Sequence, residues 1–338
     1  MDRERQVIRM ILEALGEPEG HVNRYFESDA EIIRLGDKNL LFTTDEFSEE
    51  DLFRDHHPFT LGWNVAVATI SDILASGGNP LYFGHSLTLS NKWDDDFIRK
   101  FSQGIAECLK KADVSFMGGD LGVSDKWHYT GIVLGETDKP LTRRGARAGD
   151  LIFMTGNIGA GNLEAALKLY SSHVALKPVL NQVTVKFHLR IAESKVLRKY
   201  ANSCIDSSDG VLRALINLAE ITETGFEITG PDYCKDGLLA CTLIGKPKEL
   251  LLMGECGEYE LVFTIPPELE DSFLKEADEN HLSFHKIGII TEVQRYLLNE
   301  PGRHRDFTDF RLYARDYPDV RDYLHALTNY LNDENLFA

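Results

Sequence analysis

Residues 61–80 read LGWNVAVATISDILASGGNP, and this stretch governs how the rest of the chain is interpreted. Residues 61–76 predict a helix, which the following Gly-Gly-Asn-Pro ends, as Gly and Pro commonly do. Asp72 lies inside this helix, and the residues that share its face are small or apolar: Val65, Ala68, Thr69, Ala75 and Ser76. A lone carboxylate on such a face is costly to bury unless it is paired or binds a metal ion, so this face predicts a site, with a surface position as the alternative.

Strand-like segments flank this helix, and two of them are predicted to end in an aspartate. Residues 39–44 (NLLFTT) predict a buried strand that ends at Asp45. Residues 114–117 predict a short strand that ends in Gly-Gly-Asp, the last residue being Asp120. The other elements expected in this half are a polar helical lead-in over 1–27, strands over 81–89 and 129–134, and a helix over 94–111.

The segment over residues 141–150 (LTRRGARAGD) is basic and contains glycine, which is typical of a linker. We therefore predict two domains, residues 1–140 and 141–338, which also suits a chain too long for one compact core. The elements expected after the linker are strands over 151–155, 203–205 and 261–265 and helices over 162–170 and 211–220. Strands and helices alternate without a strict βαβ rhythm, which predicts an α+β fold of mixed sheets with helices on one face.

The composition excludes several classes of protein. The net charge of -18 gives no general attraction for nucleic acid or for an anionic membrane, so neither is an expected partner. The five cysteines match neither a zinc site nor a disulfide framework. The start of the chain has no signal-peptide pattern and no apolar run is long enough to span a bilayer, so we expect a cytoplasmic protein.

Five further aspartates lie where a metal ion could use them. Asp29 is in an early turn, Asp45 and Asp120 follow strands, and Asp206 and Asp209 flank a strand-to-helix turn. Mg²⁺ prefers oxygen ligands from a few carboxylates together with phosphate oxygens and water, so this set suits Mg²⁺ ions that bridge the phosphates of ATP. Asp is also common in turns and as a helix N-cap, so each of the five, taken alone, is more often structural.

Three weaker features have equally plain alternatives. The loop over residues 156–161 (GNIGAG) could offer backbone N–H groups to a phosphate, but it lacks the Lys and Ser/Thr of a Walker loop and is more often a tight turn. Arg143 and Arg144 could bind phosphate through their planar donor groups or could simply be solvated. His56 and His57 could contact a substrate, although an exposed histidine pair in an acidic loop usually has no such role.

Taken in chain order, these segments resemble one family. They are an Asp turn at 29, TTD at 43–45, SD at 71–72, GGD at 118–120, LTR followed by GD at 141–150, the glycine loop, IDSSDG at 205–210 and EYELVFT at 258–264. This order is similar to that of the thiamine-monophosphate kinase family, within the superfamily of aminoimidazole ribonucleotide (AIR) synthetase. The resemblance runs from about residue 29 to residue 265, most of the chain.

The resemblance implies a PurM-like fold, a homodimer and a mechanism. The first domain would be a small α/β sandwich that pairs into a barrel across the dimer, the second a larger α/β domain, with ATP in the cleft between them. A small-molecule acceptor would attack the γ-phosphorus of ATP in line, with Asp72 and Asp209 as catalytic residues. The resemblance implies Mg²⁺ ligands at Asp29, Thr43, Thr44, Asp45, Asp72, Asp120, Asp206 and Asp209, and ATP contacts at Gly119, Asp120, Arg143 and Ser208.

The departures from the family pattern fall where the acceptor would bind. The kinases carry a GVHF-like stretch after TTD whose His contacts substrate, and the matching position here falls near Leu52. In the GGEDYEL segment the acidic residue before DYEL is replaced by Gly257. His56 or His57 could replace the first and Glu258 or Glu255 the second, and we expect His56 and Glu258 to contact the acceptor. The chain also continues beyond the usual end, with a predicted extra helix.

Three functions therefore stay open at this point. The chain is a thiamine-monophosphate kinase with a rebuilt substrate pocket, or an ATP-dependent enzyme of the same superfamily with another small-molecule substrate. The third possibility is a nucleotide-binding relative without turnover. The full set of aspartates argues against the third, because carboxylates that face one another carry an electrostatic cost.

Overall fold

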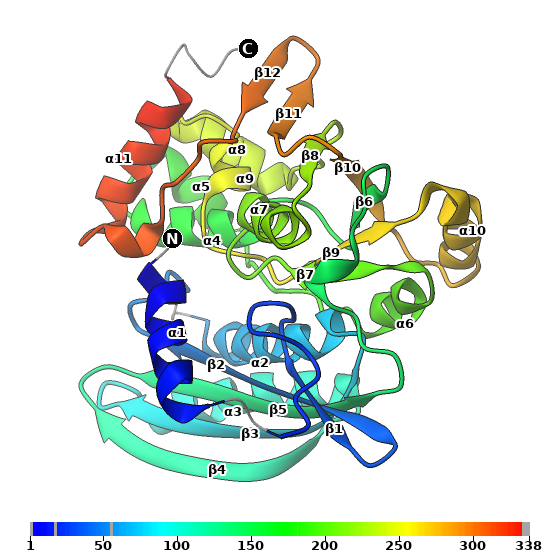
Figure 1. The fold of residues 1–338 in the computed structure, drawn as a ribbon. Coiled ribbons are helices and arrows are strands. Elements are labelled where there is room, and N and C mark those ends of the chain that lie inside the picture. The colour runs from blue at the N-terminus through cyan, green and yellow to red at the C-terminus, as the bar shows by residue number, and fades with distance from the viewer. Residues whose placement is uncertain (1–2, 17–18, 55–56, 181, 333–338) are drawn as a thin grey trace.

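The structure is a computed structural model that describes residues 3–16, 19–54, 57–180 and 182–332. These residues form two β-sheets with helices packed against them (Figure 1). The strands of the first sheet lie between residues 31 and 137, and those of the second between residues 151 and 306. Among the described residues, no helix combines the length and the apolar character that a membrane span requires.

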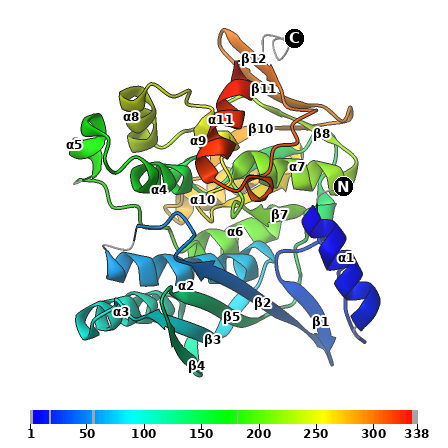
Figure 2. The same ribbon diagram turned by 90° about the vertical axis from the view of Figure 1, so that its left-hand side faces the viewer.

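The first sheet has five strands in the order β1-β2-β5-β3-β4. All neighbours are antiparallel except β3 and β4, which run parallel. Two helices, α2 (Pro58–Ala75) and α3 (Asp95–Ala112), pack on one side of this sheet and leave the other side bare (Figure 2). The strands are β1 (Glu31–Leu35), β2 (Lys38–Ser48), β3 (Asn79–Ser90), β4 (Ser115–Ser124) and β5 (His128–Thr137).

Helix α3 shows how local sequence sets its ends. Asp94 is the N-cap, and its side chain accepts a hydrogen bond from the N–H of Phe97 at 2.8 Å. Acidic residues occupy the first turn and lysines the last turn, which complements the helix dipole. The helix ends at Asp113, which adopts a left-handed conformation with φ of 57°.

Helix α2 is the centre of the molecule. Every residue from 61 to 75 is buried, because the helix contacts the first sheet on one side and strands β7 and β9 of the second sheet on the other. An apolar helix without a polar face is expected in such a position. Gly62 allows close contact with α3, since a Cβ there would lie 2.0 Å from the carbonyl oxygen of Phe101.

The second sheet has seven strands in the order β12-β11-β8-β10-β6-β9-β7. The strands are β6 (Leu151–Met154), β7 (Ser203–Asp206), β8 (Gly225–Ile228), β9 (Leu261–Ile265), β10 (His285–Thr291), β11 (Tyr296–Glu300) and β12 (Arg303–Asp306). The remaining α-helices are α1 (Arg3–Leu15), α4 (Ala160–Leu169), α5 (Lys177–Leu180), α6 (Ile191–Tyr200), α7 (Val211–Thr222), α8 (Lys235–Ile244), α9 (Leu250–Met253), α10 (Glu270–Glu279) and α11 (Val320–Leu331).

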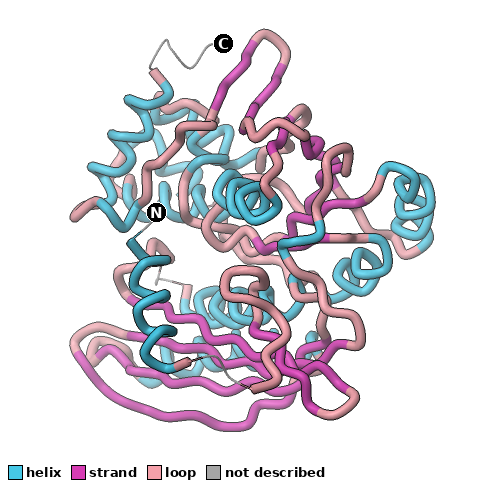
Figure 3. The backbone as a smooth tube through the Cα atoms, viewed as in Figure 1, coloured by secondary structure: helices cyan, strands magenta, loops and turns pink. Residues whose placement is uncertain are grey.

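Helices cover both faces of the second sheet, as the tube view also shows (Figure 3). Phe153 and Phe263 point into the core that includes α6 and α10, whereas Ile152 and Met154 point into the core that includes α7. The prediction of helices on one face is therefore correct for the first sheet and wrong for the second. Strands buried on both faces read as continuous apolar runs, and LIFM and LVFTI are such runs.

Two strands are longer than the sequence indicates, which corrects the positions of two aspartates. Asp45 lies inside β2, opposite Gly131, and Asp120 lies inside β4, opposite Ser86. The two glycines before Asp120 do not end the strand, because the pairing of β3 with β4 shifts register there and Gly118 takes a φ of 118°.

The segment over residues 141–150 is packed rather than free. Leu141 and Ala146 are buried, and a Cβ on Gly145 would lie 1.5 Å from the carbonyl oxygen of Asn202. The basic composition that indicates a linker thus belongs to a chain segment that packs against α7 and β7. The division into two domains at residues 140 and 141 stays a prediction.

Candidate magnesium and nucleotide site

Three carboxylates from distant parts of the chain meet at the junction of the two sheets. Asp29 precedes β1, Asp72 lies on α2 and Asp206 ends β7, and one oxygen of each lies within 4.8 Å of the others. Asp45 of β2 is close enough to raise the pKa of Asp72 electrostatically. The burial of α2 between the sheets is what brings these carboxylates together.

Hydrogen bonds orient this cluster from all sides. Thr43 donates its hydroxyl to Asp72 at 2.5 Å, and Ser71 donates its hydroxyl to Asp206 at 2.6 Å. Arg143 donates from Nη2 to Asp29 Oδ1 at 2.6 Å. The other oxygen of Asp29 is buried and has no hydrogen-bond partner among the described residues.

The cluster holds more negative charge than its surroundings compensate. Burial raises the pKa of Asp45 to about 8, helped by the charges of Asp206, Asp29 and Asp209. Burial, with the charge of Asp29, raises the pKa of Asp206 to about 6. The pKa of Asp72 is raised well above its ordinary range by burial and then by Asp45, Asp206 and Asp29. Arg143 faces these carboxylates and pairs with Asp29.

These features fit divalent cations. A buried carboxyl oxygen without a partner and several carboxylates with raised pKa values are stabilised when a hard cation takes the place of protons. Mg²⁺ takes such oxygens together with phosphate and water. The prediction that a buried Asp72 needs a partner or a metal ion is consistent with this geometry.

The structure does not bring all predicted ligands to the cluster. The side chain of Thr44 is exposed, because it alternates with Thr43 and points to the opposite face of the sheet. Gly119 and Asp120 lie on the exposed edge strand β4. Asp120 is three strands from β2, about 14 Å at the usual strand spacing, and it shares a face with Glu46 rather than with Asp45.

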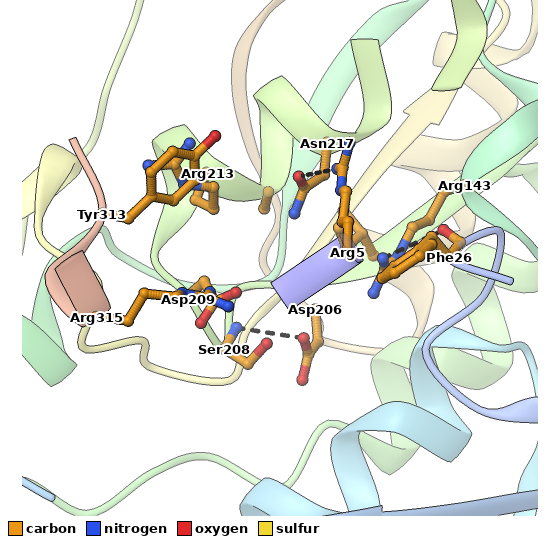
Figure 4. A pocket seen from close by; sticks show the side chains of 12 residues that line it. Arg5, Phe26, Arg143, Asp206, Ser208, Asp209, Arg213, Asn217, Tyr313 and Arg315 are labelled. Carbon is orange, nitrogen blue, oxygen red and sulfur yellow. Dashed lines mark hydrogen bonds between the residues drawn. The ribbon is translucent and has the colours of Figure 1, made fainter. Parts of the chain in front are cut away.

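A cavity of about 180 Å³ adjoins the cluster (Figure 4). Asp206, Ser208 and Asp209 form one wall, and Ser208 donates its N–H to Asp206 at 3.2 Å. Asp209 is exposed toward the cavity and Gly210 follows with φ of 79°, a turn that starts α7. The other lining residues are Arg5, Phe26, Arg143, Ile205, Arg213, Ala214, Asn217, Tyr313 and Arg315.

Three arginines that line this cavity, Arg5, Arg213 and Arg315, were not predicted from the sequence. Arg5 comes from α1, where it donates to Asn217 at 2.8 Å and to Glu220 at 2.9 Å. Arg213 of α7 is buried, donates to Glu255 at 2.9 Å and lies over the ring of Tyr313, 4.0 Å from its centroid. No motif marks these arginines, since they come from separate helices and from the C-terminal extension. Arginines at a polar cavity suit phosphate groups.

Of the histidine pair, the structure describes His57. His56 lies outside the described residues. His57 is exposed, and its carbonyl oxygen accepts the N–H of Leu61 at the start of α2. The structure does not place His57 among the residues of the carboxylate cluster. The role of His56 stays a prediction.

Glu258 binds the glycine loop instead of facing the aspartates. It is 2% exposed and accepts the N–H of Gly159 at 3.0 Å, just before α4. The chain's own carboxyl group therefore occupies the place that a phosphate would take at this helix N-terminus. Gly161 packs tightly on the same segment, since a Cβ there would lie 1.9 Å from the carbonyl oxygen of Gly257. The alternative of a tight turn thus describes this loop.

Replacing Glu258 by glutamine is expected to reduce the pH dependence of stability. Burial raises the pKa of Glu258 from 4.5 to about 8. Between these values the folded state holds a proton that the unfolded state has lost, so stability falls as pH rises from about 4.5 to about 8. Glutamine can accept the Gly159 bond without titrating. Urea unfolding at several pH values should show a smaller decline for Glu258→Gln, and an unchanged decline would contradict the assignment.

The two positions that depart from the kinase pattern lie in one place. Leu52 and Gly257 both line a small cavity of about 70 Å³, together with Ser208 and Tyr259. Ser208 also lines the arginine-rich cavity, so the 206–209 turn separates the two spaces. Sequence positions that are about 200 residues apart thus converge on one side of the turn, the side where the family resemblance implies an acceptor (the acceptor side).

Comparisons with known proteins agree with this architecture. The family model for AIR synthase related protein, N-terminal domain, matches residues 27–137. Thiamine-monophosphate kinase of Aquifex aeolicus is 31% identical over 253 residues, which are 73% of this chain and 82% of that relative. The same enzyme of Pyrococcus horikoshii is 30% identical over 267 residues, 79% of this chain and 83% of that relative.

A solved structure shows the same fold. The structure of AaThiL complexed with AMPPCP and TMP matches with a TM-score of 0.73 and 24% identity, over 90% of this chain and 97% of that chain. The predicted PurM-like fold is therefore confirmed. Fold, motif order and sequence identity together show that the chain belongs to the thiamine-monophosphate kinase family.

Proposed function

We propose that the chain is an ATP- and Mg²⁺-dependent kinase that phosphorylates thiamine monophosphate, as its relatives are named to do. The observation that carries the proposal is the convergence of four carboxylates, from four segments, beside a cavity lined by arginines. In this arrangement, carboxylates that can bind metal ions lie next to arginines that can donate hydrogen bonds to phosphate groups. Phosphoryl transfer needs positioning and charge stabilisation more than a covalent nucleophile.

We assign the metal site to the residues that the structure places together. Asp29, Asp45, Asp72 and Asp206 would hold Mg²⁺, with Asp209 at the rim of the cluster. Bound Mg²⁺ would neutralise the negative charge that builds up on the phosphate groups during transfer. Thr43 and Ser71 act by orienting Asp72 and Asp206 through their hydroxyl groups.

The nucleotide phosphates would lie in the arginine-lined cavity. Arg143 keeps its guanidinium group in place through Asp29 and the carbonyl oxygen of Phe26, at 2.6 and 3.3 Å. Its Nε is buried and has no partner among the described residues. Ser208 lies at the boundary between this cavity and the acceptor side, where the transferred phosphoryl group must pass.

A second candidate function is transfer to a different small molecule. The observation that favours it is the acceptor side itself, where Leu52 and Gly257 replace a histidine and an acidic residue. That cavity is about 70 Å³, well below the ~300 Å³ typical of drug-sized ligand pockets. A binding protein without turnover fits less well, because it has no need for uncompensated carboxylates.

A direct assay tests the proposal. Purified protein with Mg²⁺ and ATP is incubated with thiamine monophosphate, and ADP and thiamine diphosphate are measured. Equal amounts of both products support the proposed kinase. Mg²⁺-dependent ATP binding without thiamine diphosphate supports the second candidate. Absence of any ATP or Mg²⁺ binding by calorimetry overturns both.

We also propose that the chain forms a homodimer through the bare side and edge of the first sheet. Large apolar side chains are exposed there, and a monomer rarely exposes so many together. They are Phe42, Tyr82, Phe116, Met117, Leu121 and Val123, between 36% and 71% exposed. Gly119 and Asp120 lie on this edge, so we propose that they reach the nucleotide of a second copy rather than their own.

Replacing Met117 by aspartate is expected to shift the protein from dimer to monomer. Met117 is 67% exposed, so the charge does not disturb the folded chain but opposes burial in an interface. Light scattering after size-exclusion chromatography measures the mass. Val293→Asp, at a position 66% exposed on the other domain, is the matched control and should leave the mass unchanged. A monomeric wild-type protein would refute the dimer.

The division at residues 140 and 141 and the cytoplasmic location also belong to this proposal. The first sheet and the AIR synthase related match both end at residue 137, which supports a boundary close to residue 140. A kinase of a soluble coenzyme precursor is expected in the cytoplasm. Limited proteolysis would show whether the two halves separate.

A further inference from the structure

A groove lined by basic side chains lies where α2, α3 and α6 meet the segment over residues 183–190. Figure 2 shows α2 between the other two helices, both of which it contacts. The groove has a volume of about 640 Å³, and Lys111, Lys186, His188 and Lys195 line it. None of the described residues that line it is acidic, although the whole chain carries a net charge of -18. We call it the lysine groove.

The lysine groove is separate from the carboxylate cluster. Trp63, which lines the groove, precedes Asp72 on α2 by nine residues, about 14 Å along the helix axis. The described residues that line the groove do not line the arginine-lined cavity or the small cavity beside Ser208. A ligand of the groove would therefore bind outside the site that we propose for phosphoryl transfer.

Hydrogen bonds to α2 hold the chain segment that carries two of the basic residues. Asn64 donates from Nδ2 to the carbonyl oxygen of Val185 and accepts the N–H of Phe187, both at 2.9 Å. Val185 and Phe187 are buried, whereas Lys186 and His188 alternate with them and are exposed. This segment therefore presents two basic side chains to the groove from a backbone that is fixed to the central helix.

The indole ring of Trp63 positions two of the lysines. The residue is 4% exposed, and its Nε1 donates to the carbonyl oxygen of Phe187 at 2.8 Å. Lys186 Nζ lies 3.8 Å from the ring centroid and Lys111 Nζ lies 5.0 Å from it. Burial raises the pKa of Cys108 on α3 to about 12, and both lysines oppose this rise because their ammonium groups lie nearby. Cation–π contacts thus hold two positive charges beside one ring.

The positive charges of the groove are only partly compensated within the chain. Lys111 pairs with Glu107, one helical turn away, at 3.2 Å. Lys186 and Lys195 form no ion pair with any other residue in the described part of the chain. Like charges that face a common space repel one another, so an anion between them is favoured.

The size and charge of the groove restrict the kind of anion. Lysine ammonium groups bind phosphate as compact point charges, and the volume of the groove is within the ~300–1,000 Å³ typical of small-molecule sites. A large polyanion such as nucleic acid is repelled by the acidic remainder of the chain. A small anion meets mainly the charges near it, because salt screens charges more than about 8 Å away.

We propose that the lysine groove binds a small molecule that carries a diphosphate group. Two linked phosphates carry more charge than one and extend further along the groove, so they can pair with several lysines at once. Lys111, Lys186 and Lys195 come from three different elements, so a ligand that contacts them all would join α3, the 183–190 segment and α6. The inference does not rest on the proposed kinase activity.

Lysine acetylation, measured by mass spectrometry on the full chain, tests where the ligand binds. Acetic anhydride is applied with and without inorganic pyrophosphate. We expect Lys111, Lys186 and Lys195 to react about fivefold more slowly with pyrophosphate, because pairing with an anion disfavours the reactive free amine. Lys275 of α10, whose side chain is 78% exposed, is the internal control and should react at an unchanged rate. Unchanged rates at all three groove lysines would overturn the proposal.

A double variant tests the contacts themselves. Lys186→Gln/Lys195→Gln removes two exposed charges and should raise the pyrophosphate concentration that half-protects Lys111 at least about tenfold. Lys100→Gln/Lys275→Gln removes two exposed charges outside the groove and should leave that concentration unchanged. Equal effects of both double variants would attribute the binding to overall charge and contradict the proposal. Lys195→Gln alone carries the test if the first double variant does not fold.

A comparison of diphosphates identifies the source of the ligand. Inorganic pyrophosphate, ADP and thiamine diphosphate share the diphosphate group, and similar protection by all three supports recognition of that group alone. Stronger protection by one of them supports the proposal and identifies the preferred ligand. Inorganic phosphate should require at least about tenfold higher concentration. Equal protection by phosphate would contradict the diphosphate class. Protection in a protein that binds no Mg-ATP would refute the kinase and leave this inference standing.

Discussion

Replacing Asp72 by asparagine is expected to lower kcat for Mg-ATP-dependent phosphoryl transfer by at least about 10³-fold. Asp72 lies within the carboxylate cluster, where one of its oxygens is within 4.8 Å of oxygens of Asp29 and Asp206. Asparagine keeps the shape of the side chain and removes the charge that holds Mg²⁺. The loss corresponds to about 4 kcal/mol of transition-state stabilisation, at 1.36 kcal/mol for each factor of ten.

The same substitution separates function from folding. Burial and the neighbouring aspartates raise the pKa of Asp72, so its charge is a cost to the metal-free fold. Asp72→Asn should therefore melt at the wild-type temperature or above without Mg²⁺, and should lose the increase in melting temperature that Mg²⁺ gives the wild type. Asp96→Asn, at an exposed position on α3, is the control. Full activity of the Asp72→Asn variant would contradict a role of Asp72 in binding Mg²⁺.

Replacing Glu164 by glutamine is expected to lower the free energy of unfolding by about 3–5 kcal/mol. Glu164 of α4 pairs with Arg54, and the two side chains are 7% and 4% exposed. Arg54 donates to it from both its backbone N–H and its guanidinium group, at 2.8 and 2.9 Å. The neutral variant leaves a buried cation without its counter-charge, which is the costly way to break such a pair.

The pair also holds the segment that lines the acceptor side. Arg54 follows Leu52 and Phe53, and its Nη2 donates to the carbonyl oxygen of Val183 at 2.9 Å, so it ties this segment to the chain that follows α5. Urea unfolding measures the loss. Lys126→Ala, which breaks an exposed pair with Glu50, should have no measurable effect. Recovery of stability in the double variant Arg54→Met/Glu164→Met would show that the uncompensated charge, rather than lost packing, causes the effect.

The sequence determined the elements whose signals are local. The apolar run over residues 61–76 predicts a helix, and α2 spans Pro58–Ala75. The expected extra helix near the C-terminus is α11. Asp72 stood out because a carboxylate amid small and apolar residues needs a partner wherever the chain places it. These inferences need only spacing and the cost of burial, which the amino-acid sequence contains. The order of the motifs along the chain indicated the family.

The ends of the strands and the faces on which their residues lie depend on strand pairing, which cannot be read from the amino-acid sequence. Asp120 follows two glycines and reads as a strand end, yet β4 continues to Ser124 because β3 provides a partner over that length. Thr43 and Thr44 look alike in the motif, but only Thr43 points toward Asp72, since alternate residues of a strand lie on opposite faces. Helices cover both faces of the second sheet, which likewise results from packing between segments that are far apart in the sequence.

The site divides in the same way. The sequence by itself determined which residue types could hold Mg²⁺ and phosphate, because carboxylates and arginines have that chemistry in any fold. Only the tertiary structure decided that Asp29, Asp72 and Asp206 meet, that Arg5 and Arg315 reach the same cavity, and that Leu52 and Gly257 line one small cavity. The physical reason is that these contacts join segments up to about 300 residues apart, and their geometry is set by burial of α2 between two sheets.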